Sequence, residues 1–122
     1  MKRDWDIIRS VLEDIEAQTA EERENAVYVI QADQSPDDRA KVEHVFLLAR
    51  GGYLKGIWSE DLSGTMLMAL ELTWDGHDLL DTIRSSTIWS KVKAAAKTKG
   101  IELTFDAVKV LAKYALDETI KG

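Results

Sequence analysis

The 122-residue chain has no cysteine, a single proline, and no apolar run longer than a few residues. The lack of cysteine excludes disulfide bonds and thiolate metal sites. The short apolar runs cannot cross a membrane, and the first residues lack the apolar stretch of a secretory signal peptide. Apolar residues make up 45% of the chain, as in ordinary globular proteins. We therefore expect one cytoplasmic domain, residues 1–122, with one core.

Basic side chains are also scarce: the 16 lysines and arginines are outnumbered by 22 acidic residues, and the net charge is −6. That balance is unfavourable for nucleic-acid binding, whose affinity comes largely from neutralised phosphates. The distribution is uneven, however: residues 1–26 carry four basic and eight acidic side chains, whereas residues 85–101 carry four lysines and no acid. Since the distribution matters more than the total, the basic patch near the end keeps nucleic acid among the candidate partners.

The first third of the chain predicts a helix and then a strand. Trp5, Ile8, Leu12 and Ile15 recur at helical spacing, which predicts a helix over residues 3–18 with Asp4 as its N-cap. Residues 19–22 match a capping box, although such an acidic run is more typical of a solvated connector. The β-branched and aromatic residues that follow predict a strand over residues 26–32.

The centre of the chain predicts a helix followed by a hairpin. Ser35 and Pro36 form a strong helix start, and Gly51 and Gly52 end that helix. Its core-facing residues are expected to be Val42, Val45, Phe46 and Ala49. Two strands are expected next, over residues 54–59 and 66–72, with a turn over residues 60–64.

The last third predicts helices only. Thr73 is expected to cap a helix that contains Leu79, Leu80 and Ile83, and a further helical stripe runs to Gly100. Thr104 is expected to cap a final helix that reaches about residue 119. The apolar face expected for this helix consists of Phe105, Val108, Ala112 and Leu116.

The order helix, strand, helix and two-stranded wing predicts an α+β, winged-helix-like core over residues 1–84. Residues 85–122 then form a C-terminal helical extension. A standard winged helix has another helix between the strand and the glycine-terminated helix, but only residues 34–38 remain for it. The helix-turn-helix is therefore truncated or replaced, which puts insertion into the DNA major groove in doubt.

Several blocks in order carry a resemblance to a known family. They are residues 1–9, 42–56, 72–77, 81–84, 87–91 and 100–111. Together they resemble the bacterial and phage family called domain of unknown function 2513, over essentially the whole chain. The resemblance implies a small stand-alone protein with a winged-helix-like core, often associated with phages. It implies no activity and no catalytic residues.

DNA binding, as part of a transcription-regulatory module, is the first functional hypothesis. On the outer face of the helix over residues 35–51, Arg39, Glu43 and Arg50 lie together at 100° per residue, beside Ala40, His44 and Leu47. Arginines there could approach guanine and phosphate, although Glu43 and the nearby acids would repel phosphate. The four lysines of residues 85–101 could contact phosphate, or could simply belong to a solvated helix end, where positive charge is favoured. The candidate DNA contacts are Arg39, Lys41, Arg50, Lys91, Lys93 and Lys97.

A protein-interaction module, acting as a homodimer or adaptor, is the alternative hypothesis. It uses the wing and the final helix, and its candidate interface residues are Leu47, Trp58, Leu111 and Tyr114. Tryptophan is enriched in interfaces, and Trp58 on the wing is the tryptophan we expect there. Trp5, Trp74 and Trp89 are expected in the core.

Metal binding and catalysis find little support in the sequence. A carboxylate–histidine metal site could be formed by Asp75, His77, Asp78 and Asp81. The helix dipole is a simpler explanation, because it favours acidic residues in the first turn of a helix. There is no glycine-rich phosphate loop and no recognised nucleophile motif. We expect the protein not to be an enzyme and to bind no metal, cofactor or small-molecule ligand. Double-stranded DNA and a second copy of the chain remain as candidate partners.

Overall fold

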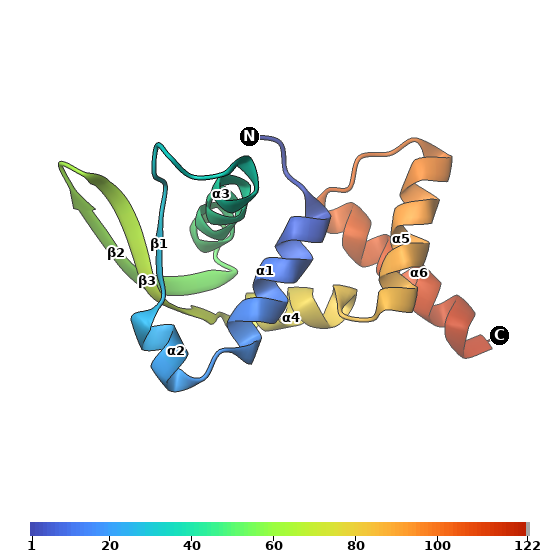
Figure 1. Cartoon of the computed structure of the whole chain (residues 1–122). Coiled ribbons are helices and arrows are strands. Elements are labelled where there is room, and N and C mark those ends of the chain that lie inside the picture. The colour runs from blue at the N-terminus through green and yellow to red at the C-terminus, as the bar shows by residue number, and fades with distance from the viewer. Residues whose placement is uncertain (122) are drawn as a thin grey trace. The chain divides into compact units, whose positions relative to one another are not determined.

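The computed structural model describes residues 1–121 (Figure 1), and the chain divides into two units, Met1–Asp78 and Leu79–Gly122. The first unit contains α1 (Trp5–Ala17), α2 (Ala20–Asn25), β1 (Val27–Val29), α3 (Pro36–Arg50), β2 (Leu54–Asp61) and β3 (Gly64–Leu72). The division falls within α4 (Trp74–Ile83), and the second unit also contains α5 (Ser86–Lys99) and α6 (Phe105–Lys121). Across residues 1–121 the chain is α+β, with six helices and one three-stranded sheet.

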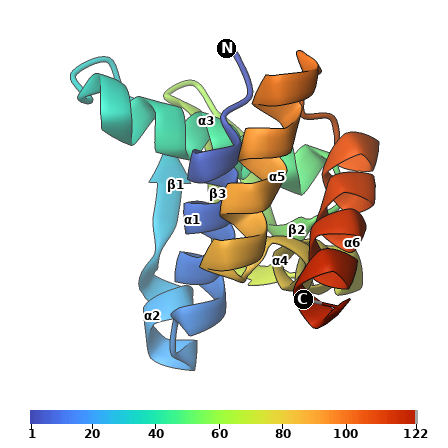
Figure 2. The ribbon, with the colours of Figure 1, turned by 90° about the vertical axis from the view of Figure 1, so that its right-hand side faces the viewer.

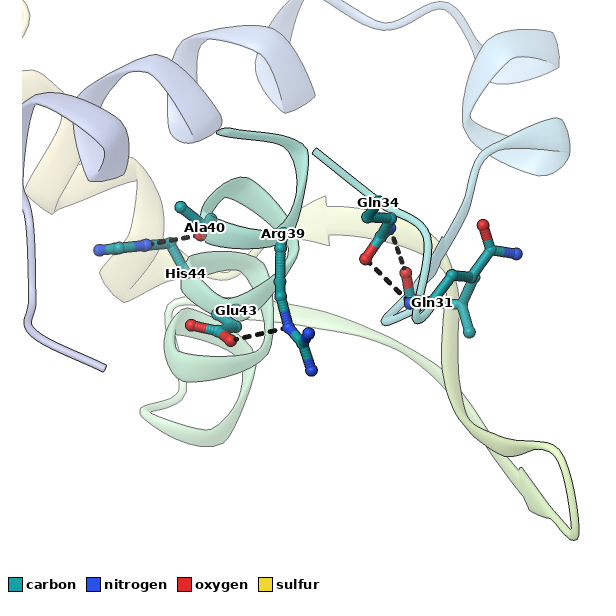
Figure 3. A network of polar contacts seen from close by, with 7 residues as sticks. Gln31, Gln34, Arg39, Ala40, Glu43 and His44 are labelled. Carbon is teal, nitrogen blue, oxygen red and sulfur yellow. Dashed lines mark hydrogen bonds and ion pairs between the residues drawn. The ribbon is translucent and has the colours of Figure 1, made fainter. Parts of the chain in front are cut away.

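The sheet is antiparallel and has the order β1-β3-β2, so that β3 is its central strand. The expected hairpin is confirmed, and its strands run closer to the turn than expected. The first strand is shorter than expected because the side chain of Gln34 folds back on it (Figure 3). Its Oε1 accepts from the backbone N–H of Gln31 at 2.9 Å, and its Nε2 donates to the carbonyl oxygen of Val29 at 2.8 Å. These bonds occupy backbone groups that a longer strand would use.

A β-bulge in β3 decides which side chains lie on each face of the sheet. The pairing passes from Lys55 opposite Glu71 to Ile57 opposite Met68, which leaves one extra residue in β3. Ala69 takes up the extra residue with a left-handed φ of 54°. Because of the bulge, Leu67 and Leu70 both face inward and are fully buried.

The inner face of the sheet is covered by α1 and α3, which also pack on each other (Figure 1). Burial confirms the expected core positions Val42, Val45 and Phe46, whereas Ala49 is only partly buried and Leu48 is buried in addition. The core of this unit is completed by Trp5, Ile8, Val11, Leu12, Ile15, Leu54, Leu67, Leu70 and Leu72.

The helix starts are set by local side-chain caps, as the sequence predicts. Oδ1 of Asp4 accepts from the N–H groups of Asp6 and Ile7, and Oγ of Ser35 accepts from the N–H of Asp38. The capping box at Thr19 is present, although the short helix that it begins has no buried residue. Thr73 and Thr104 begin α4 and α6 in the same way. Ser85 caps α5, which the sequence pattern does not predict.

In the second unit, α5 and α6 pack side by side (Figure 2). The stripe expected on α6 is only half right, because Leu116 is exposed while Val108 and Ala112 are buried. The buried stripe runs instead through Val108, Leu111, Ala112 and Ala115, at positions i, i+3, i+4 and i+7.

Two of the three tryptophans expected in the core, Trp5 and Trp89, are buried, but the expectation for Trp74 is wrong because it is 84% exposed. Trp74 is the first residue of α4. The buried positions of that helix begin at Gly76 and continue through Leu79 and Leu80. At 100° per residue Trp74 projects from the opposite side.

Candidate interaction surfaces

The two cations predicted for DNA contact in the first half of α3 already face carboxylates of their own unit. Nε of Arg39 lies 3.5 Å from Oε1 of Glu43, one turn further along α3 (Figure 3). Nζ of Lys41 lies 3.3 Å from Oδ2 of Asp14 on α1. Both pairs are partly exposed, so each is weak, but a phosphate would have to compete with a carboxylate at each cation.

Arg50, at the end of α3, lies over two aromatic rings. Its guanidinium carbon is 5.6 Å from the ring centre of Phe46 and 5.4 Å from that of Trp58 on β2. The two rings are 5.4 Å apart and tilted by 54°. Arg50 therefore joins α3 to the hairpin by cation–π contact. Trp58 and Leu47 are each exposed over more than a third of their surface.

His44 does not lie on the outer face of α3, contrary to the sequence prediction, because it is 1% exposed. Its Nε2 accepts from the backbone N–H of Asp4 at 2.9 Å, and its Nδ1 lies 2.7 Å from the carbonyl oxygen of Ala40 (Figure 3). These partners assign the hydrogen to Nδ1. The helix buries a wider stripe than the apolar residues alone indicate, since a histidine with both ring nitrogens satisfied can be buried.

The two units carry opposite net charge. The first unit has eight basic and seventeen acidic side chains, for a formal charge of −9, whereas the second has eight basic and five acidic ones, for +3. The six predicted DNA contacts are split between them: Arg39, Lys41 and Arg50 belong to the first unit, and Lys91, Lys93 and Lys97 to the second.

The lysines of α5 do not gather on one stripe. Nζ of Lys91 donates to Oγ1 of Thr119 on α6 at 2.8 Å, and Nζ of Lys93 lies 5.7 Å from the ring centre of Trp89. Only Lys93 and Lys97 are one turn apart on the helix. The basic character of this unit is therefore spread over its surface.

The outer face of the sheet, which points away from α1 and α3, is apolar and exposed at its centre. Ile57 and Val27 are 60% and 50% exposed, and both pair directly with Met68 on the central strand. Leu62, at the hairpin turn, is fully exposed. Sequence reasoning missed Val27, Ile57 and Leu62, because the alternation in β2 reveals two faces but not which of them the helices cover.

The outer face has a basic end and an acidic end along β2. At one end, Nζ of Lys55 lies 3.0 Å from Oε1 of Glu71, whose other oxygen lies 3.2 Å from Nη1 of Arg23. The Lys55 ammonium, assisted by Arg23, holds the pKa of Glu71 below its usual value. At the hairpin turn, hydrogen bonds from the hydroxyl and the N–H of Ser63 lower the pKa of Asp61, which keeps this carboxylate ionised at neutral pH.

A second exposed apolar surface lies on α6. Val110 is 68% exposed and Tyr114 is 62% exposed, and they lie one turn apart. Leu116 and Ile120, also one turn apart, are exposed on another side of the helix. The predicted interface residue Leu111 is instead buried, because it belongs to the stripe that packs in the core.

A groove of about 420 Å³ lies beside α6 in the second unit. Its apolar part is formed by Ile88, Ala112 and Leu116, and its rim carries both charges. The remaining lining residues are Asp81, Thr82, Ser85, Lys109 and Lys113.

His77 and Asp81, two members of the candidate metal set, each lie near a charged partner outside that set. Nδ1 of His77 lies 3.9 Å from Oε2 of Glu16, and Oδ1 of Asp81 lies 2.9 Å from Nη2 of Arg84. Among the residues that the structure describes, no three histidine or acidic side chains are grouped so that they could hold a metal ion. None of the helices in residues 1–121 is both long and apolar enough to cross a bilayer.

Comparison with known proteins identifies the family. The family described as "Hypothetical protein (DUF2513)" matches residues 2–102. The chain therefore belongs to this family, as the sequence blocks predict. It is also 35% identical over 120 residues to an uncharacterised protein of Haemophilus influenzae, a match that covers 98% of this chain and 99% of the relative. No solved structure is significantly similar to the chain.

Proposed function

We propose that the chain is a winged-helix-like, non-catalytic protein-interaction module. The order α1, β1, α3 and the β2–β3 hairpin, with β1 paired to β3, resembles a winged helix. One short helix differs in position, because α2 precedes β1 and residues 31–35 between β1 and α3 are not helical. The helix that would support α3 in a helix-turn-helix is therefore absent from the described part of the chain.

The observation that carries the proposal is where the exposed apolar side chains lie. Ile57, Val27 and Leu62 lie on the sheet and its turn, and Val110 and Tyr114 lie on α6. Contiguous exposed apolar surface is typical of protein contact sites. The basic side chains of α3, by contrast, already contact carboxylates or aromatic rings, and the unit that holds them has a charge of −9. Both properties disfavour phosphate binding.

Site-specific photo-crosslinking in cells of the source organism tests the proposal. A photoreactive residue is placed at Ile57 or Val110, with Asp33 and Ser90 as exposed polar controls. We expect discrete protein adducts from Ile57 or Val110 and none from the controls. Equal labelling at all four positions, or no adduct at any of them, would contradict a protein-interaction role.

Binding of duplex DNA, followed by fluorescence anisotropy across a salt series, tests the competing function. We expect no salt-sensitive binding that depends on α3. A log–log salt slope that is steep in the wild type and shallower in the double variant Arg39→Ala, Arg50→Ala would overturn the proposal, because each lost phosphate contact reduces the slope by about one.

DNA contact through the second unit is a second candidate, favoured by the charge of +3 on that unit. The pair Lys93 and Lys97 offers the best-placed cations, one turn apart. If this candidate holds, Lys93→Gln with Lys97→Gln reduces the salt slope by about two, while the Arg39→Ala, Arg50→Ala variant binds like the wild type.

A further inference from the structure

The strand β2 is the longer of the two edge strands of the sheet. It runs for eight residues beside β3 alone, whereas the opposite edge, β1, has three. Alternate residues of an edge strand point their N–H and C=O groups away from the sheet. Within residues 1–121, positions 55–61 make no backbone hydrogen bond outside the sheet. This edge therefore offers a row of backbone donors and acceptors.

The usual protections of an edge strand are weak here. Edges are commonly blocked by proline, by a bulge in the edge strand, or by central charges. The single proline of the chain lies in α3, the bulge lies in β3, and the centre of β2 carries Ile57, Trp58 and Ser59. The charged residues of β2, which are Lys55, Glu60 and Asp61, lie towards the ends of the strand.

We propose that two copies of the chain pair through their β2 strands, antiparallel, about a two-fold axis at Trp58. The two three-stranded sheets then form one six-stranded sheet. This inference rests on the proposed function, because it names a second copy as the partner of the surface around the sheet. The axis at Trp58 places Lys55 opposite the partner subunit's Asp61 on the outer face. Because of the two-fold symmetry, this contact is formed twice in the dimer.

The charges select this register over its neighbours. An axis at Ile57 would place Lys55 opposite Ser59 of the partner subunit, and an axis at Ser59 would place Asp61 opposite Ile57 of the partner subunit. In both alternatives neither Lys55 nor Asp61 faces an opposite charge across the new contact, although Lys55 keeps its ion pair with Glu71 of its own chain. The axis at Trp58 also makes the two Trp58 side chains direct cross-strand neighbours on the inner face, and both aromatic and opposite-charge pairs stabilise antiparallel strands.

Charge reversal with mixing tests the pairing. Asp61→Lys gives a chain that is basic at both ends of β2, and Lys55→Glu gives one that is acidic at both ends. We expect each variant to dimerise at least about tenfold more weakly than the wild type in sedimentation equilibrium, because like charges then oppose each other at both contacts. An equimolar mixture restores dimerisation, since both contacts are again of opposite sign. Asp33→Lys is the control for net charge and should dimerise like the wild type.

Cysteine cross-linking tests the register, because the chain has no cysteine of its own. Ile57 is expected opposite Ser59 of the partner subunit, so a mixture of Ile57→Cys and Ser59→Cys chains should form disulfide-linked heterodimers faster than either chain forms homodimers. Gel electrophoresis without reductant measures the yield. Faster self-linking of either variant, or a monomer at all concentrations, would overturn the inference.

These outcomes are separable from the test of the proposed function. A monomeric chain that still gives protein adducts from Val110 overturns the β2 pairing and leaves the interaction module standing. Loss of both the adducts and the dimer overturns both.

Discussion

The two units of the chain separate properties that a DNA-binding winged helix combines. The sheet and α3 belong to Met1–Asp78, which has a charge of −9, whereas the surplus of lysine belongs to Leu79–Gly122, which has no strand in its described residues and a charge of +3. In the first unit the candidate arginines and Lys41 are engaged by side chains of that unit. Element order alone is therefore a poor guide to DNA binding, because the charge has to lie on the elements that would enter the groove.

The largest expected difference is between two glycines at helix ends, Gly76 in the first unit and Gly100 in the second, and concerns the stability lost on substitution by alanine. A Cβ on Gly76 would lie 2.0 Å from the carbonyl oxygen of Tyr53, which accepts from the N–H of Thr73. We expect Gly76→Ala to destabilise the protein by about 3 kcal/mol or more in chemical denaturation, because the clash is with backbone. Gly100→Ala meets nothing within 4 Å and has only the left-handed φ of 67° to overcome, for about 1 kcal/mol. Equal losses at the two sites would show that the close approach at Gly76 is not rigid.

The two histidines of the chain, both in the first unit, should also differ in how much they contribute to stability. His44→Ala removes a buried ring and leaves the N–H of Asp4 and the carbonyl of Ala40 without their partner. We expect a loss of about 2–4 kcal/mol in the free energy of unfolding. His77→Ala, at an exposed position, should change it by less than about 0.5 kcal/mol. A small effect at His44 would contradict the hydrogen bonding described for its ring.

Helix caps should contribute equally to the stability of both units. The two units would then differ in charge and tertiary packing but not in capping. Ser35 caps α3 and Ser85 caps α5, each through its hydroxyl oxygen. Replacing either by alanine should cost about 1 kcal/mol in the same denaturation measurement. Ser86→Ala, one residue inside α5, is the control and should be nearly neutral. A loss at Ser35 alone would indicate that α5 is held by packing rather than by its cap.

The smallest expected effect is electrostatic and confined to the outer face of the sheet. Lys55 lowers the pKa of Glu71, so its contribution is present above the ordinary glutamate pKa and is lost as the pH falls through the lowered value. We expect Lys55→Met to raise the pKa of Glu71 towards its usual range, as measured by NMR titration of the carboxyl carbon. Arg23 remains beside Glu71, so the return should be incomplete. An unchanged titration would show that Lys55 does not act on this carboxylate in solution.

The sequence predicts best those features that depend on neighbouring residues. The sequence predicts the caps at Asp4, Ser35, Thr73 and Thr104, because a cap needs only a side chain and the amides two or three residues later. The family was also predicted, from ordered blocks along the whole chain. These features require no knowledge of what packs against them.

The errors concern residues whose environment is set by distant segments. His44 was expected on the surface, because its burial depends on the N–H of Asp4, forty residues away. Leu111 and Trp74 were assigned to the wrong side of their helices, since the apolar pattern of each helix is broader than the stripe that is buried. The outer face of the sheet was missed for the same reason: its composition follows from register and from the bulge at Ala69.

The unequal environments of the four tryptophans give the protein a set of optical reporters. Trp89 is buried in the second unit, Trp5 is buried in the first, Trp58 is partly exposed beside Arg50, and Trp74 is in water. Chains that retain a single tryptophan would emit at different wavelengths and differ in their access to a soluble quencher. The emission of Trp58 would then follow assembly at β2, while that of Trp89 would follow unfolding of the helical unit, without any added label.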